Sequence, residues 1–280
     1  MSAIDGEIIA RKSDCFITGD KQTPLRIIVH STGCNNPYLK RYVQPNDGII
    51  GDNLNHNSWN ERGQDVCVHF AIGKDKNGNV KTYQTLPVNI RAWGVYQGNN
   101  GSWNDNSIQF EILEDNLNDK SYCKKCYDKA VELCAYLCKQ YNIPKTQIFS
   151  HKECGEMGYG SKHIDPVNWW AKHGYTMNGF RKAVAEKING KPVLDATGYK
   201  KGDDTIGSLC LKKLLLTAKA LGLHDKGFYD NGGIGDGTIN AINAMLKKWG
   251  FKENGIAGKN FIIRLCKDIN NKLKSKGVIK

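Results

Sequence analysis

A break in composition at residues 189–192 constrains the fold of this chain more than any other feature. The segment Asn189-Gly190-Lys191-Pro192 sets glycine and proline close together, which interrupts helices and strands alike. Before the break, short apolar runs alternate with helical patterns, and after it only helical periodicity remains. We therefore predict two domains, residues 1–189 and 199–280, joined by a linker over residues 190–198.

The first domain has the pattern of an α/β fold. A turn at 74–79 followed by the alternating segment 80–84 predicts the returning strand of a hairpin. Helical spacing predicts helices over 121–141 and 180–188. The apolar run at 25–30 predicts a buried strand, and 66–72 and 107–113 are further predicted strands. Strands interspersed with helices predict a mixed central sheet flanked by helices.

The second domain is predicted to be small and all-α. Its amphipathic segments predict three helices, over 209–221, 238–249 and 260–272. Glycine-rich turns at 230–237 and 254–258 separate them. This part shows no catalytic constellation, and His224 stands alone in it.

The charge of the chain predicts a polyanionic partner. A formal net charge of +12 draws a protein toward nucleic acid, an acidic membrane face or a wall with anionic polymers, although a solvated lysine-rich surface is the simpler alternative. No basic helix with interleaved aromatics is present, so we expect no nucleic acid. No apolar run approaches the roughly 20 residues of a membrane span, so we expect no membrane insertion.

The start of the chain lacks the basic and apolar regions of a signal peptide. We therefore expect synthesis in a cytosol, with any export depending on another factor. In that reducing compartment the ten cysteines are expected to be free thiols. Cys126, Cys134 and Cys138 are interpreted as small apolar residues on a buried helix face.

Three residues in distant segments have the chemistry of a zinc site. His30 closes an apolar run, His151 follows another, and Asp165 precedes a proline that stiffens its backbone. A single histidine is more often a hydrogen-bonded structural residue. Two imidazoles and a carboxylate together match a hydrolytic zinc centre with an open fourth position.

Two further residues are candidates for catalysis. Glu111 lies between Phe110 and Ile112 in a predicted strand, where it is either a general base near the metal or a residue of the solvent face. His163 is either a fourth ligand or a donor that stabilises an oxyanion. His69 is interpreted as a core histidine, and the aromatic residues Trp93, Tyr96 and Trp103 as either a substrate wall or ordinary packing.

Several ordered motifs carry a resemblance to a known family. They are IIVHSTG (27–33), VHFAIGKDKNGNVKTYQTLP (68–87), RAW (91–93), NSIQFEILE (106–114) and SHKE…SKHIDPVNWW (150–170). Over roughly residues 20 to 185 the chain resembles the zinc-dependent N-acetylmuramoyl-L-alanine amidases of the type-2 class, related to peptidoglycan recognition proteins. The resemblance implies a mixed sheet with packed helices and hydrolysis of the amide between N-acetylmuramic acid and L-alanine.

The resemblance also implies roles for individual residues. His30, His151 and Asp165 would hold zinc, and Glu111 would take a proton from water. His163 stands where family members often carry a lysine that stabilises the transition state, so its role is either that one or a ligand's. Gly94 stands where many relatives have histidine, which leaves the substrate-binding residues unassigned.

The tail resembles small helical peptidoglycan-binding domains, through Lys201-Gly202-Asp203 and its two glycine-rich turns. The whole chain thereby resembles a phage endolysin, which waits in the host cytoplasm and reaches the wall through a holin lesion. The implied partner is the peptidoglycan of a Gram-positive cell wall. Alternatives are a zinc endopeptidase that cuts the stem peptide, a recognition protein without catalysis, and a bacterial autolysin.

Overall fold

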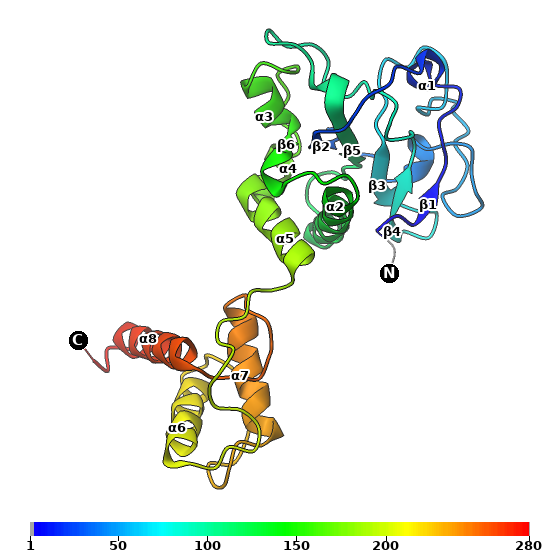
Figure 1. Cartoon of the computed structure of the whole chain (residues 1–280). Helices are drawn as coiled ribbons and strands as arrows, with labels where there is room; N and C mark the ends of the chain where they lie inside the picture. The colour runs from blue at the N-terminus through cyan, green and yellow to red at the C-terminus, as the bar shows by residue number, and fades with distance from the viewer. Residues whose placement is uncertain (1–2, 280) are drawn as a thin grey trace. The chain divides into compact units, whose positions relative to one another are not determined.

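The computed structural model describes residues 3–279 (Figure 1). The chain divides into two compact units, Met1–Ile188 and Asn189–Lys280. No helix within residues 3–279 is both long and apolar enough to cross a membrane.

A six-stranded mixed sheet forms the centre of the first unit, which confirms the predicted fold class. Its strand order is β1-β4-β3-β5-β2-β6, with β3 and β4 antiparallel and every other neighbouring pair parallel. β4 coincides with its predicted range, whereas β3 begins four residues later than predicted. The strands are β1 (Gly6–Glu7), β2 (Arg26–Ser31), β3 (Phe70–Lys74), β4 (Val80–Gln84), β5 (Ser107–Ile112) and β6 (Ile148–Ser150).

Helices pack on this sheet, and the long helix α2 supplies much of the core. Asp119 caps the start of α2 by accepting a hydrogen bond from the Tyr122 N–H. The buried face of α2 packs with β2, β3 and β5 and with the aromatic residues of α4 and α5. The helices are α1 (Asp14–Thr18), α2 (Lys120–Gln140), α3 (His151–Glu156), α4 (Val167–Lys172) and α5 (Met177–Asn189), with short 3-10 helices η1 (Leu39–Arg41), η2 (Trp103–Asn106) and η3 (Lys145–Gln147).

The cysteines follow the expectation in part. Cys126, Cys134 and Cys138 are buried thiols on the core face of α2, as predicted. Cys15 and Cys67, however, form a disulfide, so the expectation of ten free thiols is wrong for this pair. The two residues are separated by 52 positions in the sequence and meet in a small apolar cluster beside Leu86 and Ile90, a proximity that local sequence patterns do not report.

Three helices build the second unit around a core of its own: α6 (Ile206–Ala220), α7 (Asp236–Lys248) and α8 (Lys259–Ser275). Thr205 and Ser208 form a capping box at the start of α6, and Asp195 accepts a hydrogen bond of 2.8 Å from the Phe261 N–H at the start of α8. The Lys212 side chain is buried, and its ammonium donates to the carbonyls of residues 231, 232 and 233 in the glycine-rich turn.

Candidate metal centre

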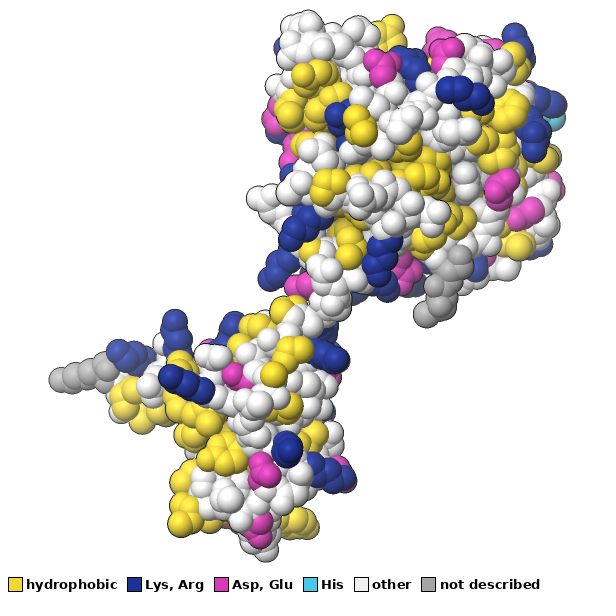
Figure 2. All heavy atoms as spheres, viewed as in Figure 1, with side chains coloured by type: hydrophobic (Ala, Val, Ile, Leu, Met, Phe, Trp, Pro, Cys, Tyr) yellow, Lys and Arg dark blue, Asp and Glu magenta, His cyan; other side chains and the backbone are white. Residues whose placement is uncertain are grey.

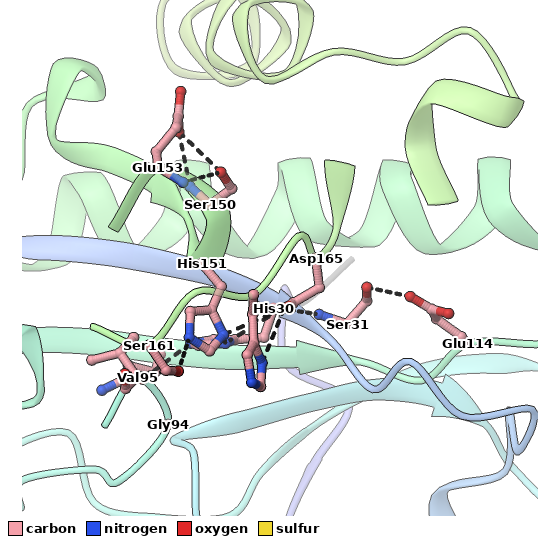
Figure 3. Close-up of polar contacts among 12 residues, drawn as sticks. His30, Ser31, Gly94, Val95, Glu114, Ser150, His151, Glu153, Ser161 and Asp165 are labelled. Carbon is pink, nitrogen blue, oxygen red and sulfur yellow. Dashed lines mark hydrogen bonds and ion pairs between the residues drawn. The ribbon is translucent and has the colours of Figure 1, made fainter. Parts of the chain in front are cut away.

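Segments distant in the sequence meet at one edge of the sheet. β2 lies between β5 and β6 and is parallel to both, so the carboxyl ends of all three strands point the same way. His30 is near the end of β2, and His151 follows β6 directly as the first residue of α3. Asp165 comes from the segment between α3 and α4, and Figure 3 shows the three side chains converging.

The distances within this group fit a tetrahedral zinc ion. His30 Nδ1 lies 3.1 Å from His151 Nδ1, and the Asp165 oxygens lie 3.6 Å from the former and 3.4 Å from the latter. Zinc bonds of about 2.0–2.1 Å in a tetrahedron separate ligand atoms by about 3.3–3.5 Å. All three residues are buried, and their ligand atoms lie close enough together to bind one metal ion.

Local structure holds each of the three residues in place. The backbone N–H of Ser31 donates to Asp165 Oδ2 at 3.1 Å. Ser150 caps α3 in a capping box with Glu153, which fixes the backbone of His151 beside it. Arg181 of α5 forms an ion pair with Glu153 at 2.5 Å and ties this cap to the helical layer.

The pKa values of His151 and Asp165 are both lowered, but for different reasons. Burial lowers the pKa of His151, which favours the neutral imidazole that a metal requires. Burial alone would raise the pKa of Asp165, but hydrogen bonds and charge from His151 and His30 hold it well below the usual range. The site therefore presents an ionised carboxylate beside two imidazoles, which is the residue chemistry of a zinc donor set.

Glu111 is buried, so the interpretation that places it on the solvent face is wrong. It pairs in register with His30 on the neighbouring parallel strand, and residues paired in this way project to the same face of the sheet. Burial raises the pKa of Glu111 well above its ordinary value, and the charges of Asp165 and Glu114 raise it further. A carboxylate of raised pKa beside the three ligand candidates has the properties of a general base.

His163 lies at the edge of the group and is not one of its three members. Its side chain is 62% exposed, and its Nδ1 lies 3.6 Å from Asp165 Oδ1. Its ring lies against that of His151, with a centroid distance of 4.4 Å. An exposed imidazole in this position is accessible to a substrate while it faces the ligand candidates.

The remaining sequence candidates fall outside the group. His69 is fully buried and hydrogen-bonded to Ile90 O and the Gln109 N–H, as expected of a core histidine. Trp103 packs between Phe149 and Tyr159. Trp93 and Tyr96 line a pocket of about 410 Å³.

Sequence reasoning missed the polar residues behind the ligand candidates. Gln109 accepts from His30 Nε2 at 3.0 Å, and Ser161 contacts His151 Nε2 at 3.0 Å. Ser31 donates its hydroxyl to Glu114, another buried carboxyl group. The sequence carries a signal for Gln109 alone. Ser107, Gln109 and Glu111 are two residues apart, so they put polar groups on one face of a central strand.

Comparisons with known proteins find a matching family and a similar curated protein. The family model described as N-acetylmuramoyl-L-alanine amidase matches residues 20–168, more than half of the chain. The chain is similar to the N-acetylmuramoyl-L-alanine amidase CwlH of Bacillus subtilis strain 168, with 29% identity over 123 residues that cover 40% of this chain and 48% of CwlH.

Two more similarities concern a larger protein and a solved structure. Protein Ami of Listeria monocytogenes is 25% identical over 178 residues, which cover 61% of this chain and 17% of Ami. The chain therefore spans less than half the length of either curated relative. The solution structure of the PlyG catalytic domain has 23% identity and a TM-score of 0.46, and the match covers 66% of this chain and 94% of that one.

Proposed function

The chain belongs to the N-acetylmuramoyl-L-alanine amidase family, and on this premise we propose that its first unit is a zinc-dependent amidase that hydrolyses the bond between N-acetylmuramic acid and L-alanine in peptidoglycan. One observation carries the zinc dependence: two imidazole Nδ1 atoms and a carboxylate lie within 4.8 Å of one another. Without a cation, three such acceptors facing one point would repel one another.

His30, His151 and Asp165 would hold the zinc. When bound there, zinc would supply a Lewis acid that polarises the scissile carbonyl and lowers the pKa of a water molecule. Glu111 would take the proton from that water, because it lies beside the ligand candidates in register with His30 and its raised pKa makes it a stronger base. His163 would donate a hydrogen bond to the oxyanion or pass a proton to the leaving amine.

We propose that the second unit attaches the enzyme to the cell wall. It carries 17 lysine and arginine residues against 8 aspartate and glutamate residues, so most of the net charge of +12 lies in this third of the chain. Figure 2 shows several Lys and Arg side chains on its visible face. Such a surface suits a Gram-positive wall with anionic polymers, and attachment raises the effective concentration of the enzyme there.

This pairing of an amidase with a wall-binding unit fits an endolysin. We propose that the protein acts in the lysis of a host bacterium by a phage. It would accumulate in the host cytoplasm and reach the wall through a holin-made lesion.

Digestion of purified Gram-positive peptidoglycan, with and without a chelator, tests the reaction. Mass spectrometry of the products should find new L-alanine amino termini with intact lactyl groups on muramic acid, and the chelator should abolish the new termini. Cuts inside the stem peptide would identify a zinc endopeptidase instead. Binding to the wall without the release of new amino termini would identify a recognition protein.

A further inference from the structure

The two histidines of the proposed zinc site share one anchoring segment, the dipeptide Gly94-Val95. This segment lies in the loop between β4 and η2 and supplies none of the three ligand candidates. Its backbone groups begin two chains of hydrogen bonds, one ending at His30 and the other at His151. Figure 3 shows Gly94 and Val95 next to Ser161, on the side of the imidazoles away from Glu114.

The chain of hydrogen bonds that ends at His30 has a fixed donor-to-acceptor direction. The N–H groups of Gly94 and Val95 lie 3.1 and 3.0 Å from one Asn104 side-chain atom, which must be the oxygen because a backbone N–H only donates. Gln109 Nε2 donates to the same oxygen at 2.8 Å, which leaves Gln109 Oε1 as the acceptor facing His30 Nε2. His30 therefore carries a proton on Nε2, and its Nδ1 points into the site.

The chain of hydrogen bonds that ends at His151 also presents an acceptor to Nε2 of the imidazole. The Val95 carbonyl accepts from the Ser161 N–H at 2.7 Å and from the Ser161 hydroxyl at 3.3 Å. Because the hydroxyl has donated its only proton, its oxygen is an acceptor for His151 Nε2 at 3.0 Å. Both imidazoles are thus held in the Nε2–H tautomer with Nδ1 toward the site.

The packing explains why residue 94 is glycine. A Cβ atom on Gly94 would lie 2.3 Å from Gln109 Oε1, closer than atoms approach without a shift. Gln109 is completely buried and Asn104 nearly so, which leaves little room for such a shift. The absence of a side chain at residue 94 is therefore coupled to the presence of glutamine at residue 109.

We propose that Gly94-Val95, acting through Gln109 and Ser161, is a positioning element that sets the tautomer of both zinc-binding histidines. The inference rests on the proposed function, since it assumes that zinc is the ligand. Gln109 and Ser161 act through the histidines and are positioning residues. Partners of this kind typically contribute about 10- to 100-fold to metal affinity.

Zinc affinity of the full chain, measured by competition with a chromophoric chelator, is the first test. Gln109→Met keeps the length of the side chain without an acceptor, and Ser161→Ala removes the hydroxyl. Each should weaken zinc binding about 10- to 100-fold. Ser161→Thr retains a hydroxyl and is the matched control, which should bind zinc like the wild type.

The ¹⁵N spectrum of the imidazoles in zinc-free protein provides a readout that a purely structural role would not change. The wild type should carry the ring proton on Nε2 of His30, and Gln109→Met should show a mixture of tautomers. Wild-type protein without zinc binding would overturn the proposed zinc site itself. Tight zinc binding by the wild type and equally by Gln109→Met and Ser161→Ala would overturn only the positioning role.

A double-mutant cycle tests the coupling between residues 94 and 109. Gly94→Ala should displace Gln109 and weaken zinc binding, whereas the same change in a Gln109→Ala background should cost less, because only His30 Nε2, 3.3 Å from the added Cβ, is then close. Additive losses in zinc affinity would contradict the coupling. Thermal unfolding of the zinc-free variants will separate a loss of affinity from a loss of folded protein.

Discussion

The two units bury polar groups in opposite ways. The first unit gathers hydrogen-bond acceptors at the edge of its sheet, where two imidazole Nδ1 atoms and the Asp165 carboxylate face one another and Glu111 lies next to them. The second unit buries a cation, the Lys212 ammonium, among three backbone carbonyls. The first arrangement would be completed by the proposed zinc ion, whereas the second contains its own cation.

This difference distinguishes buried groups that can bind a ligand from buried groups that only stabilise the fold. Buried groups that satisfy one another, such as Lys212 and its carbonyls, stabilise a turn and have no capacity left for a ligand. Buried groups that compete, such as the acceptors of the first unit, are held in place at a cost in stability and are available for binding. Substitutions of single residues test this difference between the units.

The largest expected effect is the loss of the carboxylate. Asp165→Ala removes one of three proposed ligands and should abolish both zinc binding and wall hydrolysis, and His30→Ala should do the same. Metal content and turnover of purified protein measure the effect. Full hydrolysis by metal-free wild-type protein would contradict a metal centre and remove the contrast between the units.

A smaller effect is expected when the proposed base is changed and the ligands are kept. Glu111→Gln preserves the shape of the buried side chain but cannot take a proton. It should keep zinc and lose about 10²- to 10⁴-fold in turnover. Turnover near the wild-type rate with full zinc occupancy would exclude Glu111 from proton transfer.

The pH dependence of stability should also differ between the units. Burial lowers the pKa of His69 to about 4, against an ordinary value of 6.5. Between these values the unfolded chain binds more protons, so the free energy of unfolding of the first unit should fall as the pH drops from about 6.5 to about 4, by up to about 3 kcal/mol. His69→Gln should flatten this dependence.

The control for that experiment is in the second unit. Burial also lowers the pKa of His224, but this side chain is only partly buried, so His224→Gln should change the pH dependence less. Denaturant titrations at several pH values measure both. An unchanged slope in His69→Gln would show that other groups carry the dependence.

The smallest effect should be confined to the second unit. Lys212→Met keeps the apolar stem and leaves the carbonyls of the glycine-rich turn without their donor. It should lower the free energy of unfolding of this unit by about 1–3 kcal/mol. Turnover of a small soluble muramyl peptide should stay at the wild-type level, and a loss of that turnover would show that the units are not independent in function.

The sequence predicted most of the sheet because the signals of its strands are local. β4 and β5 alternate between polar and apolar residues, and β2 contains an apolar run. The start of β3 was predicted too early, because Cys67, Val68 and His69 are apolar or buried for reasons other than strand pairing. Cys67 is bonded to Cys15, and His69 is held by side-chain hydrogen bonds.

The site was predictable only in part for a related reason. His30, His151 and Asp165 each stand in a recognisable motif, so their convergence could be predicted from the resemblance. Gln109 and Ser161 have no such mark, because their partners lie 79 and 10 residues away and depend on tertiary packing. Local patterns report which residues are polar and do not report which polar groups face one another.

The buried Lys212 has a consequence for how the protein responds to metal supply. An ammonium fixed to the chain cannot dissociate, whereas an ion held by His30, His151 and Asp165 can leave. Scarcity of zinc would therefore silence hydrolysis without loosening the three-helix unit. On the proposed function, a molecule held on the wall by its second unit would stay there in an inactive state and resume hydrolysis in place once the ion returned.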